Sequence, residues 1–233
     1  MTSGFRVATW NIHGCVGTDG VFDRERTAGV IKSLDASIVA LQEVDDGWRG
    51  PPGLDMFEFL RTQIGDHAVH ARAIIAADGH YGQMLASRWP FVESRIHDIS
   101  VAGREPRRLI DAVIDTGARH WRILATHLGL RLGERGRQLD HIRDVLAKER
   151  GLPTILLGDF NVWYPRSRAL KRLSGHMPCR SYHATFPSRF PLFPLDRIWS
   201  DAVEAWEHSA TVTSARPASD HLPVVAHFRE PPC

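Results

Sequence analysis

The stretch TILLGDFNVW, residues 154–163, joins an apolar run to an acid and an amide that stand one residue apart. The run ends at Gly158, and Asp159, Phe160 and Asn161 follow directly. Such an apolar, β-branched run predicts a buried β-strand. If the strand continues to residue 161, its period of two turns Asp159 and Asn161 to one side and Phe160 into the core. A plain turn is the alternative, because Gly, Asp and Asn are common turn formers.

Similar apolar runs recur along the chain and predict a strand-rich protein. The predicted strands are 5–12, 37–44, 81–87, 109–116, 121–128, 154–161 and 223–228. Helical patterns cover 23–34, 54–64 and 134–150. Because helices and strands do not alternate strictly, we expect mixed sheets rather than one doubly wound parallel sheet. No low-complexity linker interrupts the pattern, so we expect a single α/β domain over residues 1–233.

The composition is that of an ordinary globular protein and names no partner. The chain is 43% hydrophobic and 24% charged, with a net charge of +2. This charge alone does not indicate a nucleic acid or a membrane. Only three of the 29 basic residues are lysines. Arginine binds phosphate in a bidentate way that lysine cannot, although a GC-rich genome would produce the same bias.

The cysteines and the apolar segments indicate a cytoplasmic protein. Cys15, Cys179 and Cys233 are widely spaced and form neither a metal-binding pair nor a disulfide framework. The first residues lack the apolar core of a signal peptide. No stretch reaches the roughly 18 apolar residues that a membrane span needs. We therefore expect a reducing, cytoplasmic location.

Polar side chains stand at the ends of several predicted strands. These side chains are Asn11, His13, Gln42, Glu43, Thr126, His127, Asp159, Asn161, Asp196, Asp220 and His221. Taken singly, each is more often a turn or surface residue than a functional one. Rigid strands that aim several polar groups at one place are how proteins build a site, so their joint occurrence indicates one.

The chemistry of this set suits the hydrolysis of a phosphate ester. Oxygen donors such as Glu43 and Asp159 suit Mg²⁺ or Mn²⁺ and are poor for zinc. His127 and His221 titrate near neutral pH, and a carboxylate, Asp196 or Asp220, could hold one of them in a single tautomer. The sequence contains neither a Walker phosphate loop nor a GxSxG nucleophile motif.

In chain order, the segments TWNIHG, LQEV, THLGL, LLGDFN, LDRIW and SDHLPV resemble the endonuclease/exonuclease/phosphatase superfamily, which includes deoxyribonuclease-like and exonuclease III-like enzymes. The resemblance runs from residue 5 to residue 228. Within the superfamily, the sequence is most similar to a compact bacterial branch. It implies a four-layer α/β sandwich, with two mixed β-sheets packed face to face and helices outside. It also implies a metal-dependent phosphoric ester hydrolase with Mg²⁺ or Mn²⁺ as cofactor, and direct in-line attack by water.

The resemblance implies a metal group and a phosphate group among these residues. Glu43 corresponds to the metal-binding glutamate, with Asn11 and Asp220 beside it. Asn161 corresponds to the amide that contacts the scissile phosphate, and Asn11 is a further candidate. Arg107 is the predicted phosphate-binding arginine, with Arg104 and Arg108 as alternatives. A solvated cluster of surface charges is the competing interpretation of these arginines.

The resemblance also implies the catalytic residues. Asp159 corresponds to the aspartate that orients or deprotonates the attacking water. His221 corresponds to a histidine that acts as acid–base or stabilises the phosphate, and Asp196 to its carboxylate partner. His127 matches a histidine of the deoxyribonuclease-like branches. His13 departs from the acid that is common in the exonuclease III-like enzymes, which weakens an abasic-site nuclease interpretation.

The substrate stays open at the level of sequence. A phosphodiesterase on nucleic acid or on a phospholipid head group leads, and a phosphomonoesterase on a small soluble substrate or a silent phosphate-binding scaffold are the alternatives. A basic helix next to aromatic residues favours nucleic acid, namely Arg166, Arg168, Lys171 and Arg172 with Trp163 and Tyr164. An apolar loop favours a peripheral lipid contact, namely Phe186, Phe190, Leu192, Phe193 and Leu195. A solvated helix face and an inward-packed loop are the respective alternatives.

Overall fold

The computed structural model of the chain describes residues 4–48, 51–76, 79–148, 151–164 and 167–230. In these residues twelve strands form two six-stranded sheets. The first sheet has the order β11-β12-β1-β2-β4-β3, with β1 Gly4–Asn11, β2 Ile38–Asp46, β3 His67–Ala76, β4 Gly79–Ser87, β11 Trp206–Thr211 and β12 Val224–Arg229. The second has the order β5-β6-β7-β8-β10-β9, with β5 Phe91–Asp98, β6 Arg108–Asp115, β7 His120–His127, β8 Thr154–Asp159, β9 Cys179–Arg180 and β10 Asp196–Ser200.

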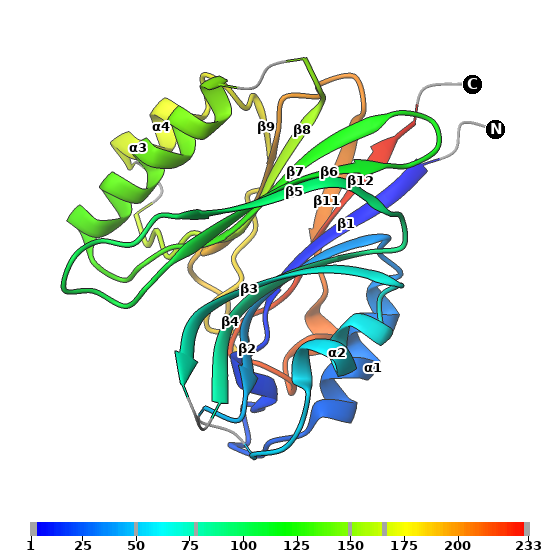
Figure 1. The fold of residues 1–233 in the computed structure, drawn as a ribbon, viewed down its shortest axis with the longest axis vertical. Helices are drawn as coiled ribbons and strands as arrows, with labels where there is room; N and C mark the ends of the chain where they lie inside the picture. Colours follow the sequence, from blue (N-terminus) through cyan, green and yellow to red (C-terminus); the bar gives the residue numbers. More distant parts are fainter. Residues whose placement is uncertain (1–3, 49–50, 77–78, 149–150, 165–166, 231–233) are drawn as a thin grey trace.

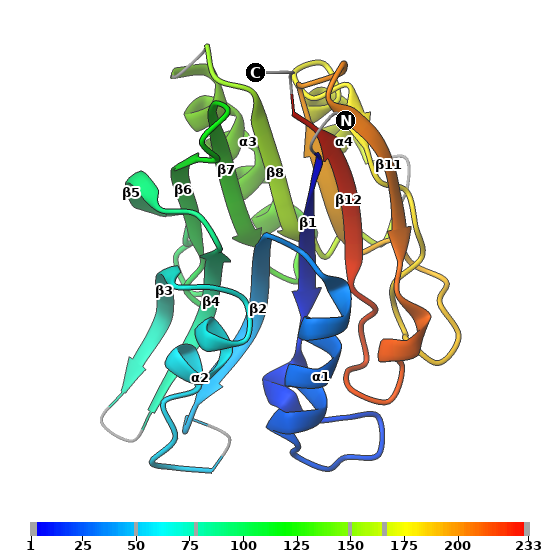
Figure 2. The same cartoon turned by 90° about the vertical axis from the view of Figure 1, so that its right-hand side faces the viewer.

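The two sheets pack face to face, with helices on both outer faces (Figure 1). Helices α1, Arg24–Leu34, and α2, Met56–Thr62, cover the first sheet. Helices α3, Leu132–Lys148, and α4, Arg168–Leu173, cover the second sheet, and α1 and α3 lie on opposite sides of the strands in the turned view of Figure 2. This arrangement confirms the predicted four-layer α/β sandwich with two mixed sheets.

Strand residues alternate between two apolar layers, which explains why the sequence shows continuous apolar runs. In β2, Ile38 and Ala40 pack between the two sheets. Val39 and Leu41 pack on the other side, against α1 and α2. A strand that is buried on both faces needs apolar residues at every position, so its sequence loses the usual polar alternation.

Strand pairing brings the ends of distant segments to one edge of the sandwich. β1 and β2 are parallel, as are β7 and β8, so the carboxyl ends of each pair lie together. His127 at the end of β7 is the register partner of Asp159 at the end of β8. Asp196 at the start of antiparallel β10 pairs with Asp159 from the other side. The fold therefore gathers the polar residues that follow separate apolar runs.

The predicted strands and helices are all present, with ends that differ by at most two residues; the predicted end of the third helix, 149–150, lies outside the described residues. The prediction missed β3, β5, β9 and β11, which are the four edge strands of the two sheets, and the five-residue β10. Edge strands expose polar side chains to solvent and therefore lack an apolar run. β5 is the clearest case, because six of its eight residues are exposed. No helix among the described residues is long and apolar enough to cross a membrane.

Candidate active site

The carboxylate of Asp159 lies at the centre of the polar side chains at the strand ends. Its Oδ1 accepts the backbone N–H of Asn161 at 2.8 Å, and its Oδ2 accepts the side-chain Nδ2 of Asn11 at 3.2 Å. The Nε2 atoms of His127 and His221 lie 3.6 and 3.9 Å from Oδ2. Four residues, from the ends of β1 and β7, the turn after β8 and the segment before β12, therefore surround one buried carboxylate.

The pKa of Asp159 is shifted into the neutral range. Burial raises this pKa, the nearby negative charge of Asp196 raises it further, and His221 and the hydrogen bonds partly oppose both, with a net value of about 6. A carboxyl group with this pKa can accept a proton at neutral pH far better than an exposed aspartate can.

Asp159 and Asn161 are joined by a turn and not by a continued strand. β8 ends at Asp159, and Asn161 has a left-handed backbone with φ of 51°. The carboxylate of Asp159 accepts the N–H of Asn161, which is the hydrogen bond of an Asx turn. The expectation of a shared parity on an extended strand was wrong, because this local bond stabilises the turn. The predicted burial of Phe160 is confirmed, since its side chain is fully buried in the core beneath α3 and α4.

Gly158 sets the distance between β7 and β8 next to the site. Its φ is 145°, which side chains rarely allow, and a Cβ at this position would lie 1.8 Å from the carbonyl oxygen of Thr126. Only glycine fits such an approach. The glycine therefore lets the backbone of β7 come close enough to place His127 beside Asp159.

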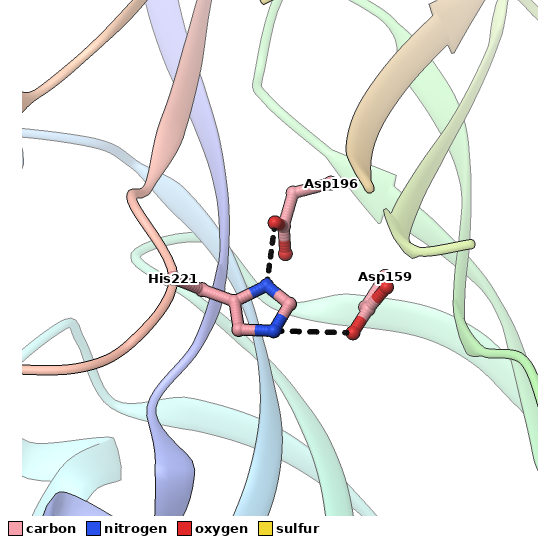
Figure 3. Close-up of side chains that lie close together, drawn as sticks. All are labelled: Asp159, Asp196 and His221. Atoms are coloured by element: carbon pink, nitrogen blue, oxygen red, sulfur yellow. Dashed lines mark hydrogen bonds and ion pairs between the residues drawn. The ribbon is translucent and has the colours of Figure 1, made fainter. Parts of the chain in front are cut away.

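His221 and Asp196 form a buried ion pair beside Asp159 (Figure 3). The Nδ1 of His221 lies 2.8 Å from Oδ2 of Asp196, and its Nε2 faces Asp159. Burial lowers the pKa of His221, but the charges of Asp196 and Asp159 outweigh burial and raise the pKa to about 10. The imidazole therefore carries a positive charge at neutral pH.

His127 has the opposite electrostatic environment. Its Nδ1 lies 3.4 Å from Nη1 of Arg107, and its Nε2 faces Asp159. Burial, the positive charge of Arg107 and that of His221 hold the pKa of His127 well below 6.5. One neutral and one charged imidazole therefore flank the same carboxylate.

Glu43 reaches the site through an irregularity in β2. The register of β2 against β4 shifts between Gln42 and Val44, and Glu43 has a left-handed φ of 58°. Such a bulge redirects one side chain without ending the strand. Oε1 of Glu43 accepts Nδ2 of Asn11 at 2.8 Å. Asn11 thus donates both side-chain N–H groups to carboxylates, since the same amide also binds Asp159.

The oxygen donors around Glu43 fit a hard divalent cation. Glu43 is partly exposed, and its second carboxylate oxygen has capacity that Asn11 does not use. In the described ranges, one group of three acidic or histidine residues converges within 4.8 Å, namely Asp159, Asp196 and His221. His221 is charged there and lies between the two carboxylates, and an imidazolium has no lone pair for a metal. The chemistry of the donors therefore favours the Glu43 side for Mg²⁺ or Mn²⁺.

Asp220 and the candidate arginines have no recorded contact with Asp159 and pair with other residues, or are exposed. Asp220 is 40% exposed at its side chain and lies 3.9 Å from Nδ1 of His13. Arg107 is buried, with Nη1 at 2.9 Å from Oε1 of Glu105. Arg104 is exposed, and Arg108 pairs with Asp98 at 2.6 Å.

Two residues that the sequence analysis did not single out fix the segment before β12. Ser219 donates its hydroxyl to the carbonyl of Asn11 at 2.8 Å and accepts the N–H of His221 at 3.1 Å. Trp10 donates its Nε1 to the carbonyl of His221 at 3.0 Å. Trp10 lies in the segment TWNIHG and Ser219 lies in SDHLPV, and both segments carry the family resemblance. Their position in these segments is the sequence feature that could have indicated a role at the site.

The apolar loop before β10 lies against the site and is exposed only at its tip. The rings of Phe186 and His221 are 4.9 Å apart, and Trp163 packs on Phe186 and Phe193. Leu195 is buried. The two exposed members are Phe190 at 78% and Leu192 at 70%. The expectation of an exposed apolar loop therefore holds for its tip, and the inward-packed alternative holds for the rest.

The basic patch lies on the short helix α4. Arg168, Lys171 and Arg172 are exposed there, and Arg172 lies 3.5 Å from Asp140 of α3. Tyr164 is exposed beside them. Arg166 lies outside the described residues.

Comparisons with known proteins agree with this fold. The Endonuclease/Exonuclease/phosphatase family matches residues 8–221. The uncharacterized protein YbhP of Escherichia coli (strain K12) is 28% identical over 249 residues, covering 96% of each chain. A Bacteroides thetaiotaomicron endonuclease/exonuclease/phosphatase family protein superposes with a TM-score of 0.77 at 17% identity and 99% coverage of both chains. The mannosyl-6-phosphatase Bt3783 of Bacteroides thetaiotaomicron superposes with a TM-score of 0.75 at 18% identity, over 96% of this chain and 99% of that one.

Proposed function

The chain belongs to the Endonuclease/Exonuclease/phosphatase family, and from this premise we propose that it is a divalent-metal-dependent phosphodiesterase. Members of the family generally hydrolyse phosphate esters. The observation that carries the proposal is the buried carboxylate of Asp159 between a neutral and a charged imidazole. This arrangement supplies a base and a positively charged hydrogen-bond donor side by side, which is what in-line attack of water on a phosphate ester requires.

Asp159 is the group that we propose to orient and deprotonate the attacking water. Its pKa of about 6 makes the carboxylate the major form at neutral pH, yet basic enough to take a proton. The N–H groups of Asn11 and Asn161 fix the carboxylate in place. A fixed base removes much of the entropic cost of bringing water to the phosphorus.

His221 is the proposed donor to the phosphate. Its Nδ1 is held by Asp196 at 2.8 Å, whereas its Nε2 lies 3.9 Å from Asp159, which is too long for a hydrogen bond. The Nε2–H therefore remains available to a phosphate oxygen or to the leaving group. A preorganised charged donor stabilises the negative charge that builds up in the transition state.

Asn161 is proposed to contact the scissile phosphate with its side-chain amide. One N–H of its Nδ2 is bound to the carbonyl of Leu128 at 2.9 Å, and an amide nitrogen has two. Asn11 differs, because both of its N–H groups are already bound to Glu43 and Asp159. We therefore propose that Asn11 holds the two carboxylates relative to each other.

Glu43, with the side-chain oxygen of Asn11, would hold the divalent cation. When bound, Mg²⁺ or Mn²⁺ would neutralise charge on the phosphate oxygens. Asp220 remains a prediction as a further ligand, since its carboxylate lies next to His13. The cytoplasmic location and the choice between Mg²⁺ and Mn²⁺ remain predictions as well.

The first test compares the hydrolysis of bis(p-nitrophenyl) phosphate with Mg²⁺, Mn²⁺ and EDTA, for wild type and His221→Ala. We expect activity that requires the metal and is lost in the variant. His208→Ala is the matched control, because His208 lies on β11 and is exposed. An activity that is indifferent to EDTA, or equal in wild type and His221→Ala, would contradict the proposal.

A phosphomonoesterase is the second candidate, and the mannosyl-6-phosphatase with the same fold supports it. Parallel assays with p-nitrophenyl phosphate separate the two activities. Plasmid DNA and phospholipid vesicles then test the two macromolecular substrates, for which the α4 patch and the tip of the apolar loop are the relevant surfaces.

A further inference from the structure

Arg107 is buried and lies on the Nδ1 side of the His127 ring, whereas Asp159 lies on the Nε2 side. The contacts of Arg107 therefore affect which ring nitrogen of His127 carries a hydrogen. Its Nη1 lies 2.9 Å from Oε1 of Glu105, an ion pair without hydrogen-bond geometry, and 3.4 Å from Nδ1 of His127, which is within hydrogen-bond distance. Its backbone N–H is bound to Oγ of Ser100 at 3.0 Å, so both ends of the residue are fixed. This environment differs from that of an arginine that reaches freely into a substrate cleft.

A guanidinium group can only donate hydrogen bonds. The ring nitrogen that faces it must therefore present a lone pair, and Nδ1 of His127 is that nitrogen. A neutral imidazole with a lone pair on Nδ1 carries its hydrogen on Nε2. In His127, Nε2 faces the carboxylate of Asp159 at 3.6 Å. The alternative tautomer would place N–H against the cation and a lone pair against the carboxylate, which is unfavourable on both sides.

We propose that Arg107 is a positioning residue that holds His127 in the Nε2–H tautomer and so keeps an N–H directed at Asp159. Arg107 then acts through His127 rather than as the phosphate contact that the sequence suggests. At 3.6 Å this N–H is too far from the carboxylate of Asp159 for a hydrogen bond, but its dipole faces the negative charge on the side that Asn11 and Asn161 do not cover. The low pKa of His127 is consistent with this arrangement, because both burial and Arg107 disfavour a second ring proton.

The direct test is the tautomer itself, in metal-free protein labelled with ¹⁵N and followed by long-range ¹H–¹⁵N correlation spectra. His127→Gln assigns the signals. We expect a neutral His127 with its hydrogen on Nε2 in wild type at pH 7.5. A hydrogen on Nδ1 in wild type would overturn the proposal without any variant and without any assumption about activity.

Variants of Arg107 test the cause. Arg107→Met removes the donors at similar length, and we expect the Nδ1–H tautomer or a protonated ring to appear. Arg107→Lys keeps a cationic donor and should retain much of the wild-type tautomer. Arg143→Met is the control, because Arg143 pairs with Asp140 on the surface of α3. A wild-type tautomer in a folded Arg107→Met protein would overturn the proposal.

The kinetic arm rests on the proposed function and separates positioning from phosphate binding. With bis(p-nitrophenyl) phosphate, Arg107→Met should lower kcat by about 10-fold to 100-fold with little change in KM. Combined with His127→Ala, it should add almost no further loss, since both changes remove the same N–H. If Arg107→Met raises KM, and if the losses of activity in Arg107→Met and His127→Ala multiply in the double variant, then Arg107 contacts the phosphate independently of His127. Absence of activity in wild type would refute the proposed function, while the tautomer would still be decided by the spectra.

Discussion

The substitution Asp196→Asn tests whether the charge of His221 depends on its buried partner. Asparagine keeps the shape and a hydrogen-bond acceptor but removes the negative charge that lies 2.8 Å from Nδ1 of His221. An opposite charge at this distance typically shifts a pKa by about 1–3 units, or about 1.4–4 kcal/mol. Starting from a pKa of about 10, the variant should bring His221 into the range of roughly 7–9.

Titration of the histidine Cε1–H signals by NMR measures this shift. The protein is kept in EDTA, and the signal of His221 is assigned by its loss in His221→Gln. In wild type, the signal of His221 should stay at its charged position from pH 5.5 to 9. In Asp196→Asn it should titrate inside this window. A wild-type His221 with a midpoint near 6.5 would refute the electrostatic reasoning, as would identical titrations in both proteins.

The same pair has a consequence for the free energy of unfolding. The pKa of His221 is higher in the folded state than the 6.5 of an unfolded chain, so its contribution is fully present below pH 6.5 and is lost as pH rises through about 10. This contribution is on the order of 5 kcal/mol, from a shift between 6.5 and about 10 at roughly 1.4 kcal/mol per pKa unit. Urea unfolding of wild type and Asp196→Asn should therefore show the largest difference near pH 6 and a smaller one near pH 10. A difference that grows with pH would contradict the assignment.

Three further predictions concern other parts of the molecule. Glu43→Gln should reduce metal-dependent hydrolysis by at least about 100-fold and abolish the thermal stabilisation by Mn²⁺, whereas a retained Mn²⁺ shift would place the cation elsewhere. Burial raises the pKa of Cys15 to about 11, so only about one thiol in a thousand is ionised at pH 8, and peptide mapping should show alkylation of the less buried Cys179 first and of Cys15 on unfolding. Gly158→Ala should destabilise the fold by more than about 3 kcal/mol in urea unfolding, because the new Cβ would collide with the backbone of β7. Gly136→Ala in α3 is the control and should stabilise the fold by about 0.5–1 kcal/mol. Similar effects for both variants would contradict the argument that β7 and β8 need a glycine to approach each other.

The sequence predicted the strands best where both faces of a strand are buried. The continuous apolar runs located the inner strands, and pairing of those strands brings the residues that follow them together without further information. His127 and Asp159 illustrate this point, because they are register partners at the ends of two parallel strands. The edge strands could not be found in the same way, since solvent accepts their polar side chains.

The details of the site depended on interactions that no periodicity reveals. The direction of Asn161 follows from an Asx turn, and that of Glu43 follows from a bulge. The surroundings of Arg107 depend on Glu105, which is close in sequence but was not expected to be its partner. Loop geometry and side-chain pairing decide such cases, and both require the folded structure.

The hydrogen bonds between β1 and the segment before β12 have a consequence for how the protein is made. Trp10 binds the carbonyl of His221, and Ser219 binds the carbonyl of Asn11, so these contacts span more than two hundred residues of chain. Contacts of such sequence separation form slowly, because the entropic cost of closing the loop precedes their gain. A ribosome that has translated only the first two hundred residues carries a chain that includes Asn11, Glu43 and Asp159 but has no His221 to place beside them. The chemistry proposed for this site therefore begins only after β12 has emerged from the ribosome and paired with β1.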